Sequence, residues 1–255
     1  MEWIDLHAHL DRLEEGVEGA IHLAKQNQVK KIVTIGTEPN DLPLVLSIAQ
    51  KHYPDVYCTL GVHPHDGIKY NQDAEKFILE NIHHKEVVAV GEIGLDYYYN
   101  HSEKNEQLKA FRAQLEIAQK SNMPVEIHTR DAEQDTVDLL KEYPGVNGLI
   151  HCFTGTRWLA EQCLNLGFNI SISGVVTFKN AHDLRETVKM IPLDRIHVET
   201  DAPFLAPVPM RGKQNTPAYV VHTAKVVAEL KGITLEQLAA QTRQNAMKLF
   251  PKIVW

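Results

Sequence analysis

Eight short runs rich in branched apolar residues alternate along this chain with longer amphipathic stretches. Such runs predict β-strands, and the stretches between them predict helices. The predicted strands cover residues 3–9, 30–37, 56–63, 87–95, 124–130, 147–153, 168–174 and 195–201. The predicted helices between them lie near residues 16–28, 39–53, 70–83, 103–121, 131–143, 156–166 and 178–191. Because each helix returns the chain to the same edge, the strands are expected to pair in parallel.

The number of strands and the chain length favour a closed barrel. The chain has 255 residues, and one β/α barrel typically takes roughly 250. A doubly wound open sheet is the alternative, but the polar residues at many strand ends favour a closed ring. We therefore expect an α/β fold of one domain over residues 1–255, a TIM-type (β/α)8 barrel with extra C-terminal helices. These helices are expected near residues 217–231 and 234–249, the second after a capping box of Thr234 and Gln237.

Composition excludes some classes of protein. Lysine and arginine number 26 against 33 acidic residues, a net charge of −7 that gives no signature of a general nucleic-acid binder. Three cysteines without metal-ligand spacing argue against a disulfide framework and indicate a reducing compartment. No signal peptide or membrane-spanning apolar run is apparent. We expect a cytoplasmic protein that is independent of membranes, with a monomer as the default.

Polar side chains gather where the predicted strands end. Interior positions of a barrel strand are usually branched and apolar, so polar residues there are informative. They come from six of the eight strands, and they are Asp5, His7, His9, His63, His65, Glu92, Glu126, His128, Arg130, His151, His197, Glu199 and Asp201. The carboxyl ends of the strands open onto one mouth, which is where active sites of such barrels lie.

Four imidazoles and two carboxylates at this mouth predict a metal centre. The predicted ligands are His7, His9, Glu92, His128, His151 and Asp201. They are enough for two divalent ions with one bridging carboxylate, an arrangement that lowers the pKa of a shared water during hydrolysis. A single histidine is more often a satisfied core residue, so the shared position of all six carries the prediction. The remaining helix and loop histidines are expected to be solvated.

Two other patterns have competing interpretations. Cys152 follows His151, which suggests a thiol nucleophile. Neighbouring strand residues face opposite ways, however, so we expect Cys152 to point toward the helices as structural filler. Three consecutive tyrosines, residues 97–99, fit either a base-stacking platform or a packed loop after the fourth strand.

An ordered set of short motifs covers essentially the whole chain. The motifs are D-x-H-x-H at 5–9, G-V-H-P-H at 61–65, G-E-I-G-L-D at 91–96, H-C-F-T-G at 151–155, E-T-D-A-P at 199–203, R-G-K-x-N-x-P at 211–217 and N-A-x-x-L-F at 245–250. Together with His128, this set resembles the TatD-type metal-dependent deoxyribonucleases, in the amidohydrolase-like barrel superfamily. The resemblance implies one metal at His7, His9 and Asp201, and another at His128 and His151, with Glu92 bridging. Zinc, manganese or magnesium suits these ligands.

The leading hypothesis is phosphodiester hydrolysis by a metal-activated water, with Asp201 and Glu92 as catalytic residues. The substrate is expected to be single-stranded DNA or frayed ends, cleaved from 3′ to 5′. The predicted phosphate contacts are His63, Arg211, Lys213 and Arg130, with Arg211 first because a guanidinium matches phosphate oxygens. One alternative is a hydrolase of a small ester, lactone, amide or phosphoester, since fold does not determine substrate. The other is a non-enzymatic metal-binding barrel.

Overall fold

The computed structural model describes all residues, 1–255, and its eight strands form one parallel sheet in the order β1 to β8. The strands are β1 (Trp3–Ala8), β2 (Val29–Ile35), β3 (Val56–Leu60), β4 (Val87–Asp96), β5 (Val125–Arg130), β6 (Gly148–Ile150), β7 (Asn169–Ile172) and β8 (Ile196–Val198). Ala8 forms a parallel bridge with Ala202, and the His9 amide donates to the Ala202 carbonyl, so β1 also meets the segment after β8. This contact closes the ring, and the predicted TIM-type barrel is confirmed.

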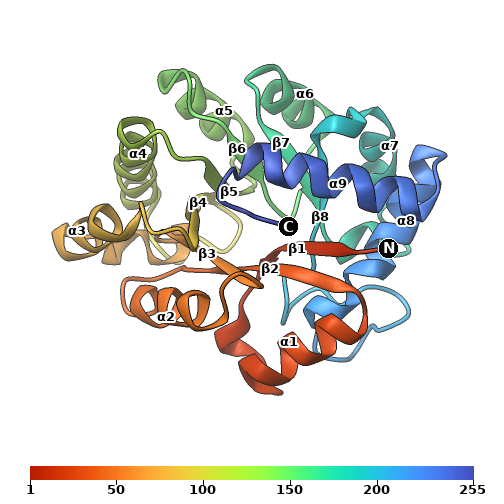
Figure 1. Cartoon of the computed structure of the whole chain (residues 1–255). Helices are drawn as coiled ribbons and strands as arrows, with labels where there is room; N and C mark the ends of the chain where they lie inside the picture. Colours follow the sequence, from red (N-terminus) through yellow and green to blue (C-terminus); the bar gives the residue numbers. More distant parts are fainter.

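The chain has nine α-helices, of which α1 to α8 surround the barrel and α9 crosses one of its ends (Figure 1). They are α1 (Gly16–Gln26), α2 (Leu42–His52), α3 (Gln72–Asn81), α4 (Lys104–Ser121), α5 (Glu133–Glu142), α6 (Arg157–Asn165), α7 (His182–Met190), α8 (Val220–Lys231) and α9 (Leu235–Leu249). The capping box at α9 is confirmed, because the Thr234 side chain accepts from the Gln237 amide and the Gln237 side chain accepts from the Thr234 amide. No helix is both long and apolar enough to cross a bilayer.

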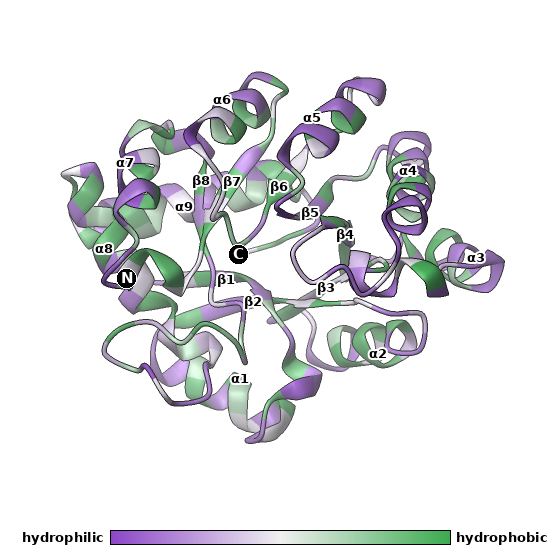
Figure 2. Cartoon of the chain, turned by 180° about the vertical axis from the view of Figure 1, so that it is seen from behind, coloured by the Kyte–Doolittle hydropathy of each residue, from purple (hydrophilic) through white to green (hydrophobic).

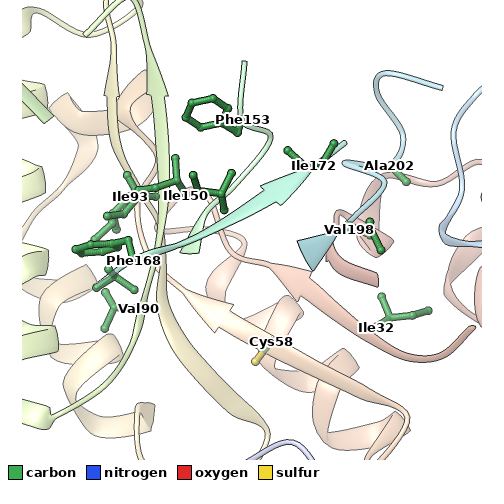
Figure 3. Close-up of a cluster of buried hydrophobic side chains, with 14 of the residues drawn as sticks. Ile32, Cys58, Val90, Ile93, Ile150, Phe153, Phe168, Ile172, Val198 and Ala202 are labelled. Atoms are coloured by element: carbon green, nitrogen blue, oxygen red, sulfur yellow. The ribbon is translucent and has the colours of Figure 1, made fainter. Parts of the chain in front are cut away.

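The main hydrophobic core lies between the strands and the surrounding helices. It is one cluster of 56 buried residues, and Figure 3 shows some of them, including Ile93, Ile150 and Phe168, close to the strands. The helices carry hydrophobic residues on one side and hydrophilic residues on the other, which gives them the mixed colours of Figure 2. Burial of their apolar faces against the strands therefore holds the helical layer in place.

The C-terminal segment closes one end of the barrel. Figure 1 shows α9 crossing this end, with the C-terminus near its centre. Leu249 and Phe250 belong to a second buried cluster with strand residues such as Ile4 and Tyr57. The Lys252 ammonium donates to the carbonyls of Ile82, His84 and Val87, which precede or begin β4. The carboxyl ends of the strands therefore form the other, open end.

Gly94 allows β4 to lie close against β5. Its φ is +138°, and a Cβ placed there would be 1.9 Å from the carbonyl oxygen of His128. Only glycine fits such a conformation and such a short approach. The glycine between Glu92 and Asp96 in the G-E-I-G-L-D motif therefore brings β4 side chains into reach of His128 on β5.

Candidate metal centre

The first cluster of ligand-type atoms lies where β1 meets the segment after β8. The Nε2 atoms of His7 and His9 each lie 3.6 Å from Oδ1 of Asp201. His7 is in β1, His9 directly follows it, and Asp201 lies three residues beyond the end of β8. One ligand atom from each of the three lies within 4.8 Å of the others, so this group can hold a metal ion.

The second cluster lies around Glu92 of β4. Its Oε1 is 2.8 Å from Nε2 of His151, 3.2 Å from Nδ1 of His128 and 3.3 Å from Nε2 of His63. His63, Glu92 and His128 form another group of atoms close enough to hold an ion. His63 was predicted only as a phosphate contact, but it lies among the predicted ligands.

Glu92 connects the two clusters. Its Oε2 lies 3.6 Å from Nε2 of His7, while Oε1 faces the second cluster. The Glu92 side chain is buried, with a relative exposure of 4%. Burial raises its pKa, but the facing imidazoles of His151 and His63 and the hydrogen bond from His128 outweigh this effect and hold it well below its usual range. Glu92 is therefore ionised and has one oxygen on each side, the geometry that a bridging ligand requires.

Two buried glutamates lie beside the Nδ1 atoms of His7 and His151. Oε1 of Glu126 lies 2.6 Å from Nδ1 of His7, and Oε1 of Glu199 lies 3.3 Å from Nδ1 of His151. Metal-ligating histidines usually donate their other ring N–H to such a partner, which sets the tautomer and the ring orientation. The sequence predicted that both glutamates lie at the mouth of the barrel, but it predicted no role for them.

Asp96 has the same function at His128. Its Oδ2 lies 2.9 Å from Nε2 of His128 and 3.0 Å from Nε2 of His65. Burial raises the Asp96 pKa, but hydrogen bonds from His128 and His65 bring it well below its usual range. Asp96 is therefore a carboxylate that turns Nδ1 of His128 toward Glu92. Asp96 is the last residue of the G-E-I-G-L-D motif, but residue spacing did not predict its contact with His128.

The donor set fits a metal ion. Nε2 of His7 is buried and has no hydrogen-bond partner, although Nδ1 of the same ring is paired with Glu126. A buried polar atom without a partner is costly, and a cation beside Nε2 would satisfy it. Burial, together with the neighbouring His151, lowers the His7 pKa well below its ordinary value, so the ring is in the neutral form that binds metals.

The end of β8 is shaped by a contact that the strand pattern did not predict. β8 ends at Val198, and Asp201 has a positive φ of 58°, so strand alternation does not extend to Asp201. Instead, the Asp201 amide donates to the His7 carbonyl, and the Thr200 amide donates to Oδ1 of Asp5. These bonds to β1 place Asp201 opposite His7 and His9. Asp5 itself lies outside the ligand clusters.

A cleft of about 630 Å³ opens above the two clusters, a size within the usual range for ligand pockets. Of the predicted phosphate contacts, His63 and Arg130 line the cleft, and so does Arg12, for which the sequence predicted no role. Arg12 follows β1 by four residues and donates to the Thr37 hydroxyl at 2.5 Å. A single arginine in a loop gives no signal in the sequence alone.

Arg211 and Lys213 do not line the cleft. Both are exposed. The Arg211 guanidinium stacks over the Phe178 ring at 4.0 Å and donates to the Ala206 carbonyl. The loop after β8 holds Arg211 against Phe178, because stacking on an aromatic face stabilises a guanidinium. Contact of Arg211 and Lys213 with a substrate phosphate stays a prediction.

A family model described as TatD related DNase matches residues 4–251 of this chain. The chain belongs to the TatD family. An uncharacterized metal-dependent hydrolase of Bacillus subtilis, YabD, is 42% identical over 96% of this chain and 98% of its own length. The 3′-5′ ssDNA/RNA exonuclease TatD of Pectobacterium parmentieri is 39% identical over 94% of this chain and 95% of its own. The crystal structure of YJJV, a TatD homologue from Escherichia coli, covers 98% of each chain with a TM-score of 0.90 and 28% identity.

As a TatD-family member, the chain is a metal-dependent hydrolase. The motifs quoted from the sequence therefore resemble the right family, and that identification is confirmed. The structure brings all six predicted ligands together. Which of them bind metal, and how many ions they hold, stays a prediction.

Cys152 of this TatD-family chain lines the cleft, so the expectation that it points toward the helices is wrong. β6 ends at Ile150 and Cys152 has a positive φ of 42°, so strand alternation does not reach it. Its Sγ lies 3.2 Å from the Ser173 hydroxyl. Burial raises the pKa of the thiol well above its ordinary value, which disfavours the nucleophilic thiolate.

Proposed function

We propose that this TatD-family hydrolase cleaves phosphodiester bonds at the 3′ end of single-stranded DNA, with two divalent ions held in its two ligand clusters. The position of Glu92 between the clusters is the observation that carries the proposal. His7, His9 and Asp201 would hold one ion, and His128 and His151 the other, with His63 as a further ligand candidate. Ions bound there would lower the pKa of a water and neutralise charge on the phosphoryl oxygens.

Asp201 would act on the attacking water. It is the member of the first cluster with the most exposed side chain, at 12%, and it lies at the cleft wall. A carboxylate side chain in this position can orient a water and accept its proton. Glu92, in contrast, is nearly enclosed by imidazoles, so its role would be to bridge the ions rather than to move a proton.

Arg12 and Arg130 would hold the negatively charged strand. Both line the cleft, and they come from opposite sides of the barrel, after β1 and at the end of β5. Guanidinium groups donate to phosphate oxygens with two parallel N–H bonds. The net charge of −7 suits an enzyme that takes one strand end into a cleft better than one that follows duplex DNA. The relative named a 3′-5′ ssDNA/RNA exonuclease supports the same polarity.

The test is hydrolysis of one single-stranded DNA oligonucleotide labelled at either its 5′ or its 3′ end. Wild type is compared with Glu92→Gln, which keeps the volume but removes the bridging charge, with added manganese, magnesium or zinc and with chelator. With the 5′ label, we expect a metal-dependent ladder of successively shorter products. With the 3′ label, we expect immediate release of a labelled mononucleotide. Glu92→Gln should lose about 100-fold or more in rate, because even partners of metal ligands contribute up to about 100-fold.

Other outcomes would contradict the proposal. Release of a mononucleotide from the 5′ label would reverse the polarity. A metal-loaded wild type that is inert on DNA but active on a small ester, lactone or phosphoester would favour a small-molecule hydrolase. Glu142→Gln is the matched control, because Glu142 is an exposed carboxylate on α5 that pairs only with Arg112. It should behave as wild type.

A further inference from the structure

Two exposed tyrosines stand beside the second ligand cluster. Tyr98 and Tyr99 follow β4 and are 58% and 51% exposed. The Arg130 guanidinium lies 3.9 Å from the centroid of the Tyr98 ring and 4.8 Å from that of Tyr99. The Tyr99 ring also makes an edge contact with His65, at 5.5 Å between centroids. We call these three residues, Tyr98, Tyr99 and Arg130, the tyrosine platform.

The Tyr99 ring also stacks with the His101 ring, at 5.7 Å between centroids, but no ion pair or hydrogen bond explains the position of Arg130. Arg130 forms no ion pair, and its side chain makes no hydrogen bond within the protein. Tyr97, by contrast, donates its hydroxyl to Asp135 at 2.7 Å and is partly buried. Of the three consecutive tyrosines, one is thus packed while two are presented to solvent. Large exposed aromatic rings at the edge of a cleft are typical of a ligand-binding surface.

An apolar wall stands beside the first ligand cluster. Phe204 is 48% exposed, and its ring lies 5.8 Å from the ring of His9. Leu205 and Val175 continue this wall along the cleft. The wall follows β7 and β8, while the tyrosine platform follows β4 and β5. In a ring of eight strands, these positions lie across the mouth from one another, with the ligand clusters between them.

We infer that the tyrosine platform and Phe204 are two nucleobase-binding surfaces, which receive the bases on the two sides of the scissile phosphate. The inference rests on the proposed phosphodiester hydrolysis and adds what the site recognises. Base faces stack on aromatic rings and on guanidinium planes with little regard to sequence. The Arg130 guanidinium lies over the Tyr98 ring, and its N–H groups make no hydrogen bond within the protein, so they are free for the adjoining phosphate. The site would then require a flexible strand whose bases are unstacked from each other.

The test combines ring removal in the protein with base removal in the substrate. The substrates are short single-stranded oligothymidylates, intact or with a tetrahydrofuran abasic residue at the terminal or the penultimate position. On the intact substrate, we expect Tyr99→Ala and Phe204→Ala each to lower kcat/KM about 5- to 150-fold, the effect of losing one base–aromatic stack. Each variant should show no further loss on the substrate that lacks its own base, because the pair is then already broken.

Conservative variants and a distant pair serve as controls. Tyr99→Phe and Phe204→Tyr keep the ring and should stay within about twofold of wild type, given the size of the stacking effect. Trp255→Ala removes a similarly exposed aromatic ring that also lies under an arginine, with Arg243 at 5.0 Å. Trp255 bonds to Glu2 before β1, at the closed end of the barrel, and its removal should leave kcat/KM unchanged.

If ring removal and base removal lower kcat/KM independently, so that each variant loses the same factor on every substrate, the inference is overturned and phosphodiester hydrolysis still stands. If wild type does not cleave the intact substrate, the proposed function fails and stacking is tested separately by binding. A trithymidylate with one 2-aminopurine is titrated with chelated protein, since stacking quenches its fluorescence. Quenching that Tyr99→Ala or Phe204→Ala abolishes and Trp255→Ala retains would support the two surfaces. Absence of quenching by wild type would exclude them.

Discussion

The Nδ1 atom of His7 lies 2.6 Å from Oε1 of Glu126 on the opposite side of the barrel, and both side chains are fully buried. His7 is in β1 and Glu126 is in β5, so the contact crosses the interior. It leaves Nε2 of His7 directed toward Asp201 and Glu92. Burial raises the pKa of Glu126 well above its ordinary value in the metal-free protein. A cation at Nε2 would favour the ionised carboxylate, because it strengthens the Nδ1–H donor.

Replacing Glu126 should weaken metal binding. Glu126→Gln is expected to lower the affinity about tenfold and Glu126→Ala about 100-fold, the range found for partners of metal-ligating histidines. Affinity is measured by competition with a chromophoric chelator, after circular dichroism has verified that the variants are folded. The surface change Glu142→Ala serves as control. Equal affinities for wild type and Glu126→Ala would show that the contact only supports the fold.

His63→Ala should lower the metal content of the second cluster. Nε2 of His63 lies 3.3 Å from Oε1 of Glu92, at the same oxygen that His128 and His151 approach. We expect weaker binding of one equivalent of metal, by about tenfold or more, with the other equivalent unaffected, since loss of one ligand leaves the first cluster complete. Isothermal titration with manganese measures both. Unchanged metal binding together with a raised KM would instead make His63 a substrate contact alone.

Gly94→Ala should destabilise the barrel between β4 and β5. The added Cβ would lie 1.9 Å from the His128 carbonyl oxygen, at a φ of +138°. Overpacking costs about 1 to 3 kcal/mol, and a positive φ adds about 1 to 2 kcal/mol for a residue with a side chain. Urea denaturation should show a loss of about 2 to 5 kcal/mol. Gly145→Ala is the control, because its φ is +91° but nothing lies within 4 Å of the new Cβ. Gly145→Ala should therefore lose only the part of the stability that comes from the positive φ, about 1 to 2 kcal/mol.

His197 should make unfolding depend on pH. Burial lowers its pKa to about 3, and its Nε2 lies 2.8 Å from Nδ2 of Asn169, so the folded protein holds it neutral. Between pH 3 and its ordinary value of 6.5, the unfolded chain binds more protons than the folded protein. Stability is therefore lost as pH falls through this window. His197→Gln should reduce the slope by up to about 1.4 kcal/mol per pH unit.

The slope is measured by urea denaturation from pH 4 to 7 in the presence of chelator, so that metal release does not contribute. Wild type and His197→Gln share every other titrating group, so the difference between their slopes measures the contribution of His197. His83→Gln, which changes an exposed histidine, should leave the slope as in wild type. Parallel curves for wild type and His197→Gln would show that His197 titrates in the folded protein as it does in the unfolded chain.

The barrel and the set of residues at its mouth follow from the pattern of the amino-acid sequence. Alternating strand and helix patterns of ordinary length can close in few ways, because parallel strands need crossovers and eight of them complete a ring. His7, His128 and His151 were identifiable because they lie at predicted strand ends, which a barrel brings to one face.

Tertiary structure alone decided which side chains touch. His7 meets Glu126, and His128 meets Asp96, through contacts between strands that no spacing within one strand encodes. The segment beyond β8 is held by bonds to β1, and the loop after it places the Arg211 guanidinium over the Phe178 ring. Arg12 reaches the cleft from the end of a 3-10 helix that is too short to show a periodic pattern in the sequence. Loop geometry follows from packing against distant residues, so Arg12 and Phe204 could be placed at the cleft only in the folded chain.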